Sequence, residues 1–275
     1  MQIGKKNTLK VLRDTSVGMF LGDEEGQDVL LPNKYVPRDQ HLDVDIEVFV
    51  YKDSEDRLVA TTLEPLVQLH EFACLKVVGV NNAGAFLDWG LEKDLLLPHK
   101  QQTDKLEVGD WAVVYVYLDE NTDRLAASCK LNKFFEFENI ELTQGQEVDL
   151  LVYKTTDLGL NVVINNKYTG LIYENEIFKR AAWGERLKGF IKNIRPEGGI
   201  DVSLQQQGYQ QIEPTAQLIL EKLKANEGFL PLTDKSDPIA VAEVLEMSKK
   251  TFKKAVGLLY KQQLITLETE GIRLV

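Results

Sequence analysis

Apolar and polar residues alternate in short runs along most of this chain. Val44–Val50 reads VDIEVFV and Trp111–Tyr117 reads WAVVYVY, and both runs are rich in β-branched and aromatic residues. Turn-forming clusters such as Asp53–Asp56 and Asp119–Asp123 follow them. This pattern is typical of strands joined by tight turns, and it predicts about five strands in every 60–70 residues.

The strand pattern is repeated along the chain. Val17–Lys34 (VGMFLGDEEGQDVLLPNK) and Ala83–Lys100 (AGAFLDWGLEKDLLLPHK) lie 66 residues apart and are identical at eight of eighteen positions. In a weaker third copy, 75 residues further on, Gly159 corresponds to Gly84. A unit of this size is typical of a small closed barrel, which leaves no exposed sheet edge. We therefore predict three tandem barrels, over residues 1–65, 66–135 and 139–207.

After residue 210 the apolar spacing becomes helical. Three helices are predicted: Pro214–Leu223, Ile239–Leu245 after the start signal Ser236-Asp237-Pro238, and Lys249–Lys261 with Ser248 as its cap. Leu264–Leu267 and Ile272–Val275 predict a hairpin. Three helices followed by a hairpin indicate a winged helix-turn-helix over residues 211–275. The predicted fold class is mainly β, with a C-terminal α+β domain.

The net charge of −11 opposes contact with phosphate, but the charge is unevenly distributed. Residues 1–65 carry 8 basic and 13 acidic side chains, whereas residues 211–275 carry 9 of each. Two segments are basic. Met247–Leu267 holds five lysines and no acid, and Phe178–Pro196 holds six basic residues and one acid. On a helix, Phe252, Val256 and Leu259 would face the core and leave Lys250, Lys253 and Lys254 outward.

The third repeat resembles the S1 RNA-binding motif, a five-stranded oligonucleotide-binding (OB-fold) barrel. The resemblance is carried by DLGLNVVINNKYTGLIYENEI, residues Asp157–Ile177, and the first two repeats keep GMFL and GAFL followed by LLP. Three such barrels followed by a winged helix resemble the bacterial conserved virulence factor B family. That resemblance implies RNA binding and an influence on the expression of virulence genes.

The resemblance also implies positions that contact RNA. A stacking phenylalanine of the motif corresponds to Phe20 and Phe86, an arginine to Arg57 and Arg124, and a histidine to Tyr173. Aromatic faces stack on unpaired bases, and basic side chains follow the phosphates. Together with the two basic segments, the predicted RNA contacts are Phe20, Phe86, Arg57, Arg124, Tyr173, Lys179, Arg180, Arg186, Lys188, Lys192, Arg195, Lys250, Lys253 and Lys254.

Several of these residues could instead have a purely structural role or lie on ordinary surface. Phe20 and Phe86 could be barrel-core aromatics, and Tyr173 could be a structural tyrosine with a bonded hydroxyl. The basic residues of both segments, Met247–Leu267 and Phe178–Pro196, could form ordinary solvated faces.

Catalytic signals are weak. His70-Glu71 begins like a zinc-protease motif but lacks its second histidine, and no phosphate-binding glycine loop ending in Gly-Lys-Ser/Thr occurs. Cys74 and Cys129 have no metal-ligand spacing. We therefore expect neither catalysis nor a bound metal or cofactor. The sequence also predicts neither a membrane span nor a signal peptide, which indicates a location in the cytoplasm.

The sequence therefore predicts a noncatalytic protein that binds single-stranded RNA and regulates gene expression after transcription. The third barrel and the lysine-bearing helix would form its main contact surface. Two alternatives stay open. The winged helix could make the chain a DNA-binding transcriptional regulator, or the acidic first two barrels could hold protein partners in a scaffold.

Overall fold

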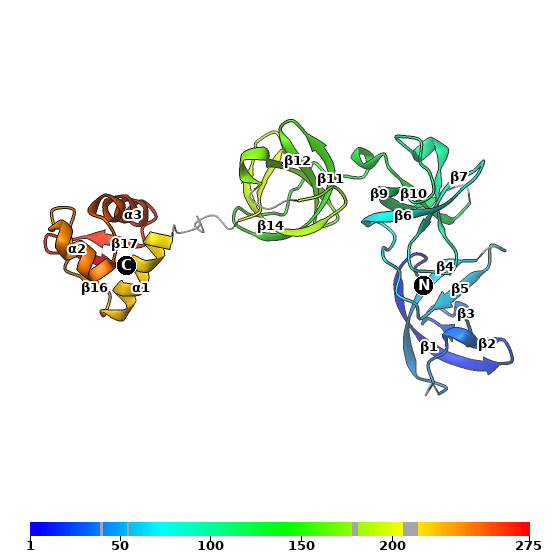
Figure 1. The fold of residues 1–275 in the computed structure, drawn as a ribbon. Coiled ribbons are helices and arrows are strands. Elements are labelled where there is room, and N and C mark those ends of the chain that lie inside the picture. Colours follow the sequence, from blue (N-terminus) through cyan, green and yellow to red (C-terminus); the bar gives the residue numbers. More distant parts are fainter. Residues whose placement is uncertain (39–40, 54, 121, 178–180, 206–213) are drawn as a thin grey trace. The chain divides into compact units, whose positions relative to one another are not determined.

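The structure is a computed structural model that describes residues 1–38, 41–53, 55–120, 122–177, 181–205 and 214–275. It divides into two compact units, Met1–Leu204 and Gln205–Val275. The first unit holds three closed five-stranded barrels (Figure 1), and the second holds three helices and a small sheet. The predicted fold class is confirmed.

The three barrels are built from fifteen strands. Barrel 1 comprises β1 (Lys6–Thr15), β2 (Gly18–Gly22), β3 (Asp28–Pro32), β4 (Asp45–Lys52) and β5 (Leu58–Thr61). Barrel 2 comprises β6 (Phe72–Val80), β7 (Gly84–Asp88), β8 (Leu95–Pro98), β9 (Trp111–Asp119) and β10 (Arg124–Ser128). Barrel 3 comprises β11 (Glu147–Thr156), β12 (Gly159–Ile164), β13 (Tyr168–Tyr173), β14 (Arg186–Ile194) and β15 (Ile200–Ser203).

All three barrels share one strand order. In each, the third strand pairs in parallel with the fifth, and the other pairs are antiparallel. The first strand is irregular at the same place each time: between Val11 and Arg13, between Val77 and Gly79, and between Val152 and Lys154. Such a bulge bends the strand and helps a short sheet to close on itself. The repeat in the sequence is therefore a repeat in the fold.

Buried aromatic residues join neighbouring barrels. Trp89 of barrel 2 is 2% exposed, and its ring lies edge-on to Phe49 of barrel 1 with centroids 5.6 Å apart. Phe72 of barrel 2 stacks on Phe135, which follows that barrel, at 5.1 Å, and Phe135 lies 5.5 Å from Tyr153 of barrel 3. Burial of aromatic surface on this scale contributes strongly to stability. The barrels thus pack on one another as well as around their own cores.

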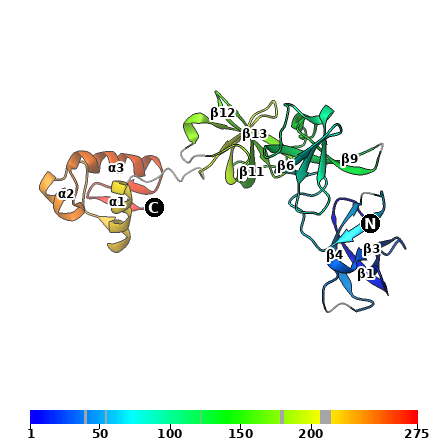
Figure 2. The ribbon, with the colours of Figure 1, turned by 45° about the vertical axis from the view of Figure 1, so that its right-hand side comes forward.

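The C-terminal unit consists of α1 (Pro214–Ala225), α2 (Pro238–Leu245) and α3 (Lys249–Lys261), with β16 (Phe229–Leu230), β17 (Ile265–Leu267) and β18 (Ile272–Leu274). The helices pack with the sheet around one apolar core. Figure 2 shows α1, α2 and α3 grouped together in this unit. The Asp237 carboxylate accepts from the Ile239 N–H and the Ser248 hydroxyl from the Thr251 N–H, so both predicted helix starts are confirmed. Within the described parts of the chain, no helix combines the length and apolar character needed to cross a bilayer.

Candidate nucleic-acid interface

In barrel 1, Phe20 and Arg57 line one hollow of about 710 Å³. Phe20 lies on β2 and Arg57 just before β5, and Tyr35 and Tyr51 complete an aromatic lining. The Phe20 ring is half-buried, and the Arg13 guanidinium lies 4.0 Å from its centroid. The hollow therefore brings together two of the predicted contacts on barrel 1.

The cations of this hollow are already paired with acids. Arg57 forms ion pairs with Asp53 at 2.7 Å and Glu55 at 2.8 Å, and Lys34 pairs with Glu92. Burial acts to raise the pKa of Asp53, but hydrogen bonds from Arg57 outweigh it and the pKa is lowered. Such pairing leaves little net positive charge to attract a phosphate.

In barrel 2 the two predicted RNA contacts, Phe86 and Arg124, differ in what surrounds them. Phe86 is half-buried on β7, whereas Arg124 at the start of β10 is directed to barrel 1. The Arg124 Nε lies 2.5 Å from Asp56 of the β4–β5 turn, and Lys52 of barrel 1 lies 3.5 Å from Asp123. Both ion pairs join the two barrels, so Arg124 has a structural role here.

In barrel 3, Tyr173, Arg195 and Asp201 form a hydrogen-bonded group. Arg195 donates to the Tyr173 hydroxyl at 2.7 Å and pairs with Asp201, whose carboxylate accepts from its Nε at 3.2 Å. Asp201 is only 8% exposed, and the Arg195 guanidinium lowers the pKa of its carboxyl. The geometry fits the alternative of a structural tyrosine with a bonded hydroxyl, while the half-buried ring leaves part of its surface accessible.

Three more of the predicted basic contacts in the third barrel also have partners. Lys188 pairs with Asp149 at 2.8 Å, Lys192 pairs with Glu176, and Arg186 donates to the Phe72 carbonyl of barrel 2 at 2.7 Å. Lys179 and Arg180 lie outside the described residues. Of the four described basic side chains in this segment, Lys188, Lys192 and Arg195 are therefore paired with acids.

Helix α3 carries its lysines as predicted. Phe252, Ala255, Val256 and Leu259 are buried, and the side chains of Lys250, Lys253 and Lys254 are exposed. Lys253 lies 4.0 Å from Asp234, at the limit of an ion pair. This basic face belongs to the second compact unit, whereas the other described contacts that the sequence predicts belong to the first.

Sequence reasoning missed two tryptophans. Trp111 is 55% exposed and Trp183 is 43% exposed, in contrast to the buried Trp89. No local pattern in the sequence separates these two indoles from that of Trp89, and a large exposed aromatic marks a contact surface only once its exposure is known. Among the described residues no group of His, Cys, Asp and Glu is placed to hold a metal ion.

Comparison with known proteins gives consistent matches. The model described as S1 domain matches residues 3–63 and 71–130, and the model described as CvfB-like winged helix domain matches residues 217–274. Over 281 residues the chain is 27% identical to conserved virulence factor B of Staphylococcus epidermidis, covering 99% of this chain and 94% of that protein. Over 276 residues it is 29% identical to the uncharacterized protein YitL of Bacillus subtilis, covering 95% and 90%.

A solved structure also matches along the full length. It is a multidomain protein with nucleic acid binding domains from Streptococcus pneumoniae, 23% identical, with a TM-score of 0.46 and coverage of 99% of this chain and 98% of that one.

Proposed function

Because the chain belongs to the conserved virulence factor B family and carries S1 and winged-helix domains typical of nucleic-acid-binding proteins, we propose that it binds single-stranded RNA. We place it in the cytoplasm, as a noncatalytic regulator of gene expression after transcription. The observation that carries this proposal is the presence of three closed five-stranded barrels in one compact unit, two of which match the S1 model. Barrels of this type present aromatic and basic side chains to unpaired bases and their phosphates.

The proposal of a noncatalytic role is supported by the surroundings of His70. Its Nδ1 lies 2.9 Å from the Tyr115 hydroxyl, and burial, with a smaller contribution from Lys5, lowers its pKa. The neighbouring Glu71 accepts from the Gln68 N–H at 2.9 Å. Both side chains therefore hold local structure, and the zinc-protease resemblance of this pair has no geometric support.

Duplex DNA binding through the winged helix is the second candidate. The exposed lysines of α3 favour it, because a helix in this position can lie in the major groove. The wing between β17 and β18 opposes it, since Arg273 donates to Glu268 at 2.7 Å and Glu270 adds a further negative charge. This wing is poorly suited to the strongly negative minor groove.

A binding panel tests the proposal. Full-length protein is titrated with single- and double-stranded RNA and DNA of equal length, at several salt concentrations. We expect the tightest binding to unstructured RNA and a linear fall of log affinity with log salt. Tightest binding to duplex DNA would replace the proposal with the second candidate, and no binding to any polymer would favour a protein-binding scaffold.

A further inference from the structure

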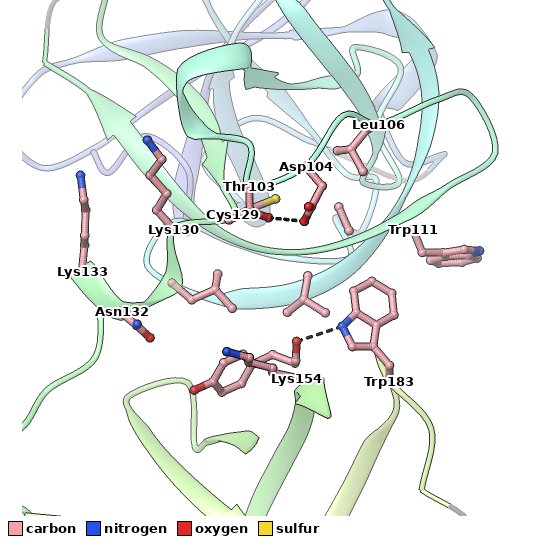
Figure 3. Close-up of a pocket in the computed structure, with 14 residues that line it drawn as sticks. Thr103, Asp104, Leu106, Trp111, Cys129, Lys130, Asn132, Lys133, Lys154 and Trp183 are labelled. Carbon is pink, nitrogen blue, oxygen red and sulfur yellow. Dashed lines mark hydrogen bonds between the residues drawn. The ribbon is translucent and has the colours of Figure 1, made fainter. Parts of the chain in front are cut away.

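A groove lies between barrels 2 and 3, and none of the predicted contact residues is among the described residues that line it. It encloses about 670 Å³. Barrel 2 supplies the start of β9 and the segment after β10, and barrel 3 supplies the end of β11 and the loop before β14 (Figure 3). The floor includes Val113 and Leu131, which are buried.

Two exposed indoles lie at one end of the groove. Trp111 is on barrel 2 and Trp183 on barrel 3, and Figure 3 shows them on opposite walls. The Trp183 N–H donates to the Tyr153 carbonyl at 2.9 Å, which fixes the orientation of that ring. Flat aromatic faces held in this way stack on unpaired bases at little entropic cost.

Three lysines give the same groove a positive charge. Lys130, Lys133 and Lys154 are exposed, and none forms an ion pair with a described residue. Asp104 is the one acid among the described residues of the lining. The hollow in barrel 1 differs, because Asp28, Asp53 and Glu92 outnumber Lys34 and Arg57 there. In a chain of net charge −11, the groove is the better place for a phosphate.

The walls of the groove are held together by contacts already described. Phe135, in the segment between the barrels, stacks on Phe72 of barrel 2 and lies 5.5 Å from Tyr153 of barrel 3, and Arg186 of barrel 3 donates to the Phe72 carbonyl. These contacts join barrel 2 to barrel 3 next to the groove. A preformed groove of this kind binds without a large ordering cost.

We propose that this groove binds a segment of single-stranded RNA, with bases on Trp111 and Trp183 and phosphates near Lys130, Lys133 and Lys154. The proposal rests on the proposed function and names the surface that performs it. Figure 3 shows Lys130 and Lys133 at the end opposite the two indoles, so a strand along the groove would meet both kinds of contact.

Tryptophan fluorescence tests the indoles directly. The chain has three tryptophans, and only Trp89 is buried at 2% exposure. Titration with a 12-nucleotide oligouridylate should quench the wild-type protein. The double variant Trp111→Phe/Trp183→Phe, which keeps Trp89, should show no quenching while still binding the labelled oligonucleotide in an anisotropy assay. Undiminished quenching in the double variant would overturn the proposal.

Affinity measurements supply the second test. Trp111→Ala and Trp183→Ala should each weaken oligouridylate binding by about 5- to 150-fold, the range for loss of one stacked base. Phe137→Ala is the matched control, because Phe137 is 57% exposed and does not line the groove. Its affinity should equal that of the wild type. Wild-type affinity in both tryptophan variants would contradict the proposal.

The lysines are tested with a charge-matched pair of variants. Lys130→Glu/Lys133→Glu should weaken binding and reduce the log–log salt slope by about 1.4. Lys10→Glu/Arg38→Glu makes the same change of charge on exposed residues of barrel 1 and should leave the slope unchanged. If the wild type binds and both double variants behave alike, the groove is not the site. If the wild type itself does not bind, the proposed function fails with it.

Discussion

Three glycines at equivalent positions explain why the repeat keeps this residue. Gly18, Gly84 and Gly159 begin the second strand of their barrels with φ of +148°, +155° and +138°. A Cβ at each would lie 2.0–2.2 Å from a carbonyl oxygen of the next strand. No side chain fits such a close approach of two backbones. The glycines aligned in the sequence are therefore required by the same contact in every barrel.

Replacing one of these glycines should destabilise its barrel. Gly84→Ala combines backbone strain with an overlap against the Leu97 carbonyl, and we expect a loss of about 2–4 kcal/mol in the free energy of unfolding. Gly109→Ala is the control, because Gly109 also has a positive φ, +101°, but has open space around it. Its cost should be about 1–2 kcal/mol. Urea titrations measure the free energy of unfolding of both variants. Equal losses would contradict the prediction, because they would show that the overlap between the new Cβ and the Leu97 carbonyl costs nothing.

The ion pair between Arg195 and Asp201 could not be predicted by counting charged residues along the sequence. The sequence presented Arg195 as one of six basic residues beside a single acid, but Asp201 lies next to it across a turn between two strands. Local charge counts cannot detect such partners, because strand pairing decides which side chains meet. The same holds for Lys188 and Asp149 on adjacent strands.

Asp201→Asn should therefore cost stability in a pH-dependent way. At pH 7 we expect a loss of about 1–3 kcal/mol, because Arg195 loses a charged hydrogen-bond partner. The folded pKa of Asp201 is lowered, so its contribution is present above the unfolded pKa and is lost as the pH falls through the folded pKa. The difference in melting temperature between the two proteins should narrow as the pH falls from 7 to 3. A constant difference over that whole range would contradict this interpretation.

At the scale of elements, the sequence predicted most of the C-terminal unit correctly. Helix α3 begins and ends at the predicted residues, since a capping serine and a regular apolar face determine them locally. Strand β16 was missed because two residues are too few for a periodic signal. That strand pairs with β18, a contact set by the tertiary fold rather than by local pattern.

The lysine face of α3 should contribute to RNA binding through phosphates. Lys250→Glu/Lys253→Glu is expected to weaken binding by a similar factor for different RNA sequences and to lower the salt slope. Lys222→Glu/Lys224→Glu on α1 is the matched control, since both lysines are exposed and lie outside α3. Anisotropy titrations at three salt concentrations measure both effects. Identical behaviour of the two variants would mean that α3 is only a solvated face.

At the scale of the whole molecule, aromatic contacts between neighbouring barrels pack them into one compact unit. Trp89 belongs to barrel 2 but packs on Phe49 and Tyr51 of barrel 1. The repeat predicted the barrels and could not reveal these contacts, because Trp89 meets Phe49 and Tyr51 between two copies of the repeat rather than within one. The groove with Trp111 and Trp183 was missed for the same reason, since two separate repeats build it.

Calorimetry should detect the two compact units. Trp89→Ala removes a large buried ring and should cost about 3–5 kcal/mol in the unit of residues 1–204. The transition of residues 205–275 should stay at its wild-type temperature, because that unit has its own apolar core. A shift of both transitions by the same amount would show that the two units unfold together.

A competition experiment shows whether the protein prefers single-stranded RNA to duplex DNA. Full-length protein is saturated with a labelled, unstructured RNA, and unlabelled RNA or duplex DNA of the same length is added at one fixed salt concentration. The three barrels predict that the RNA displaces the label at a lower concentration than the duplex does. Displacement by the duplex at a lower concentration would contradict the account and assign the binding to the winged helix.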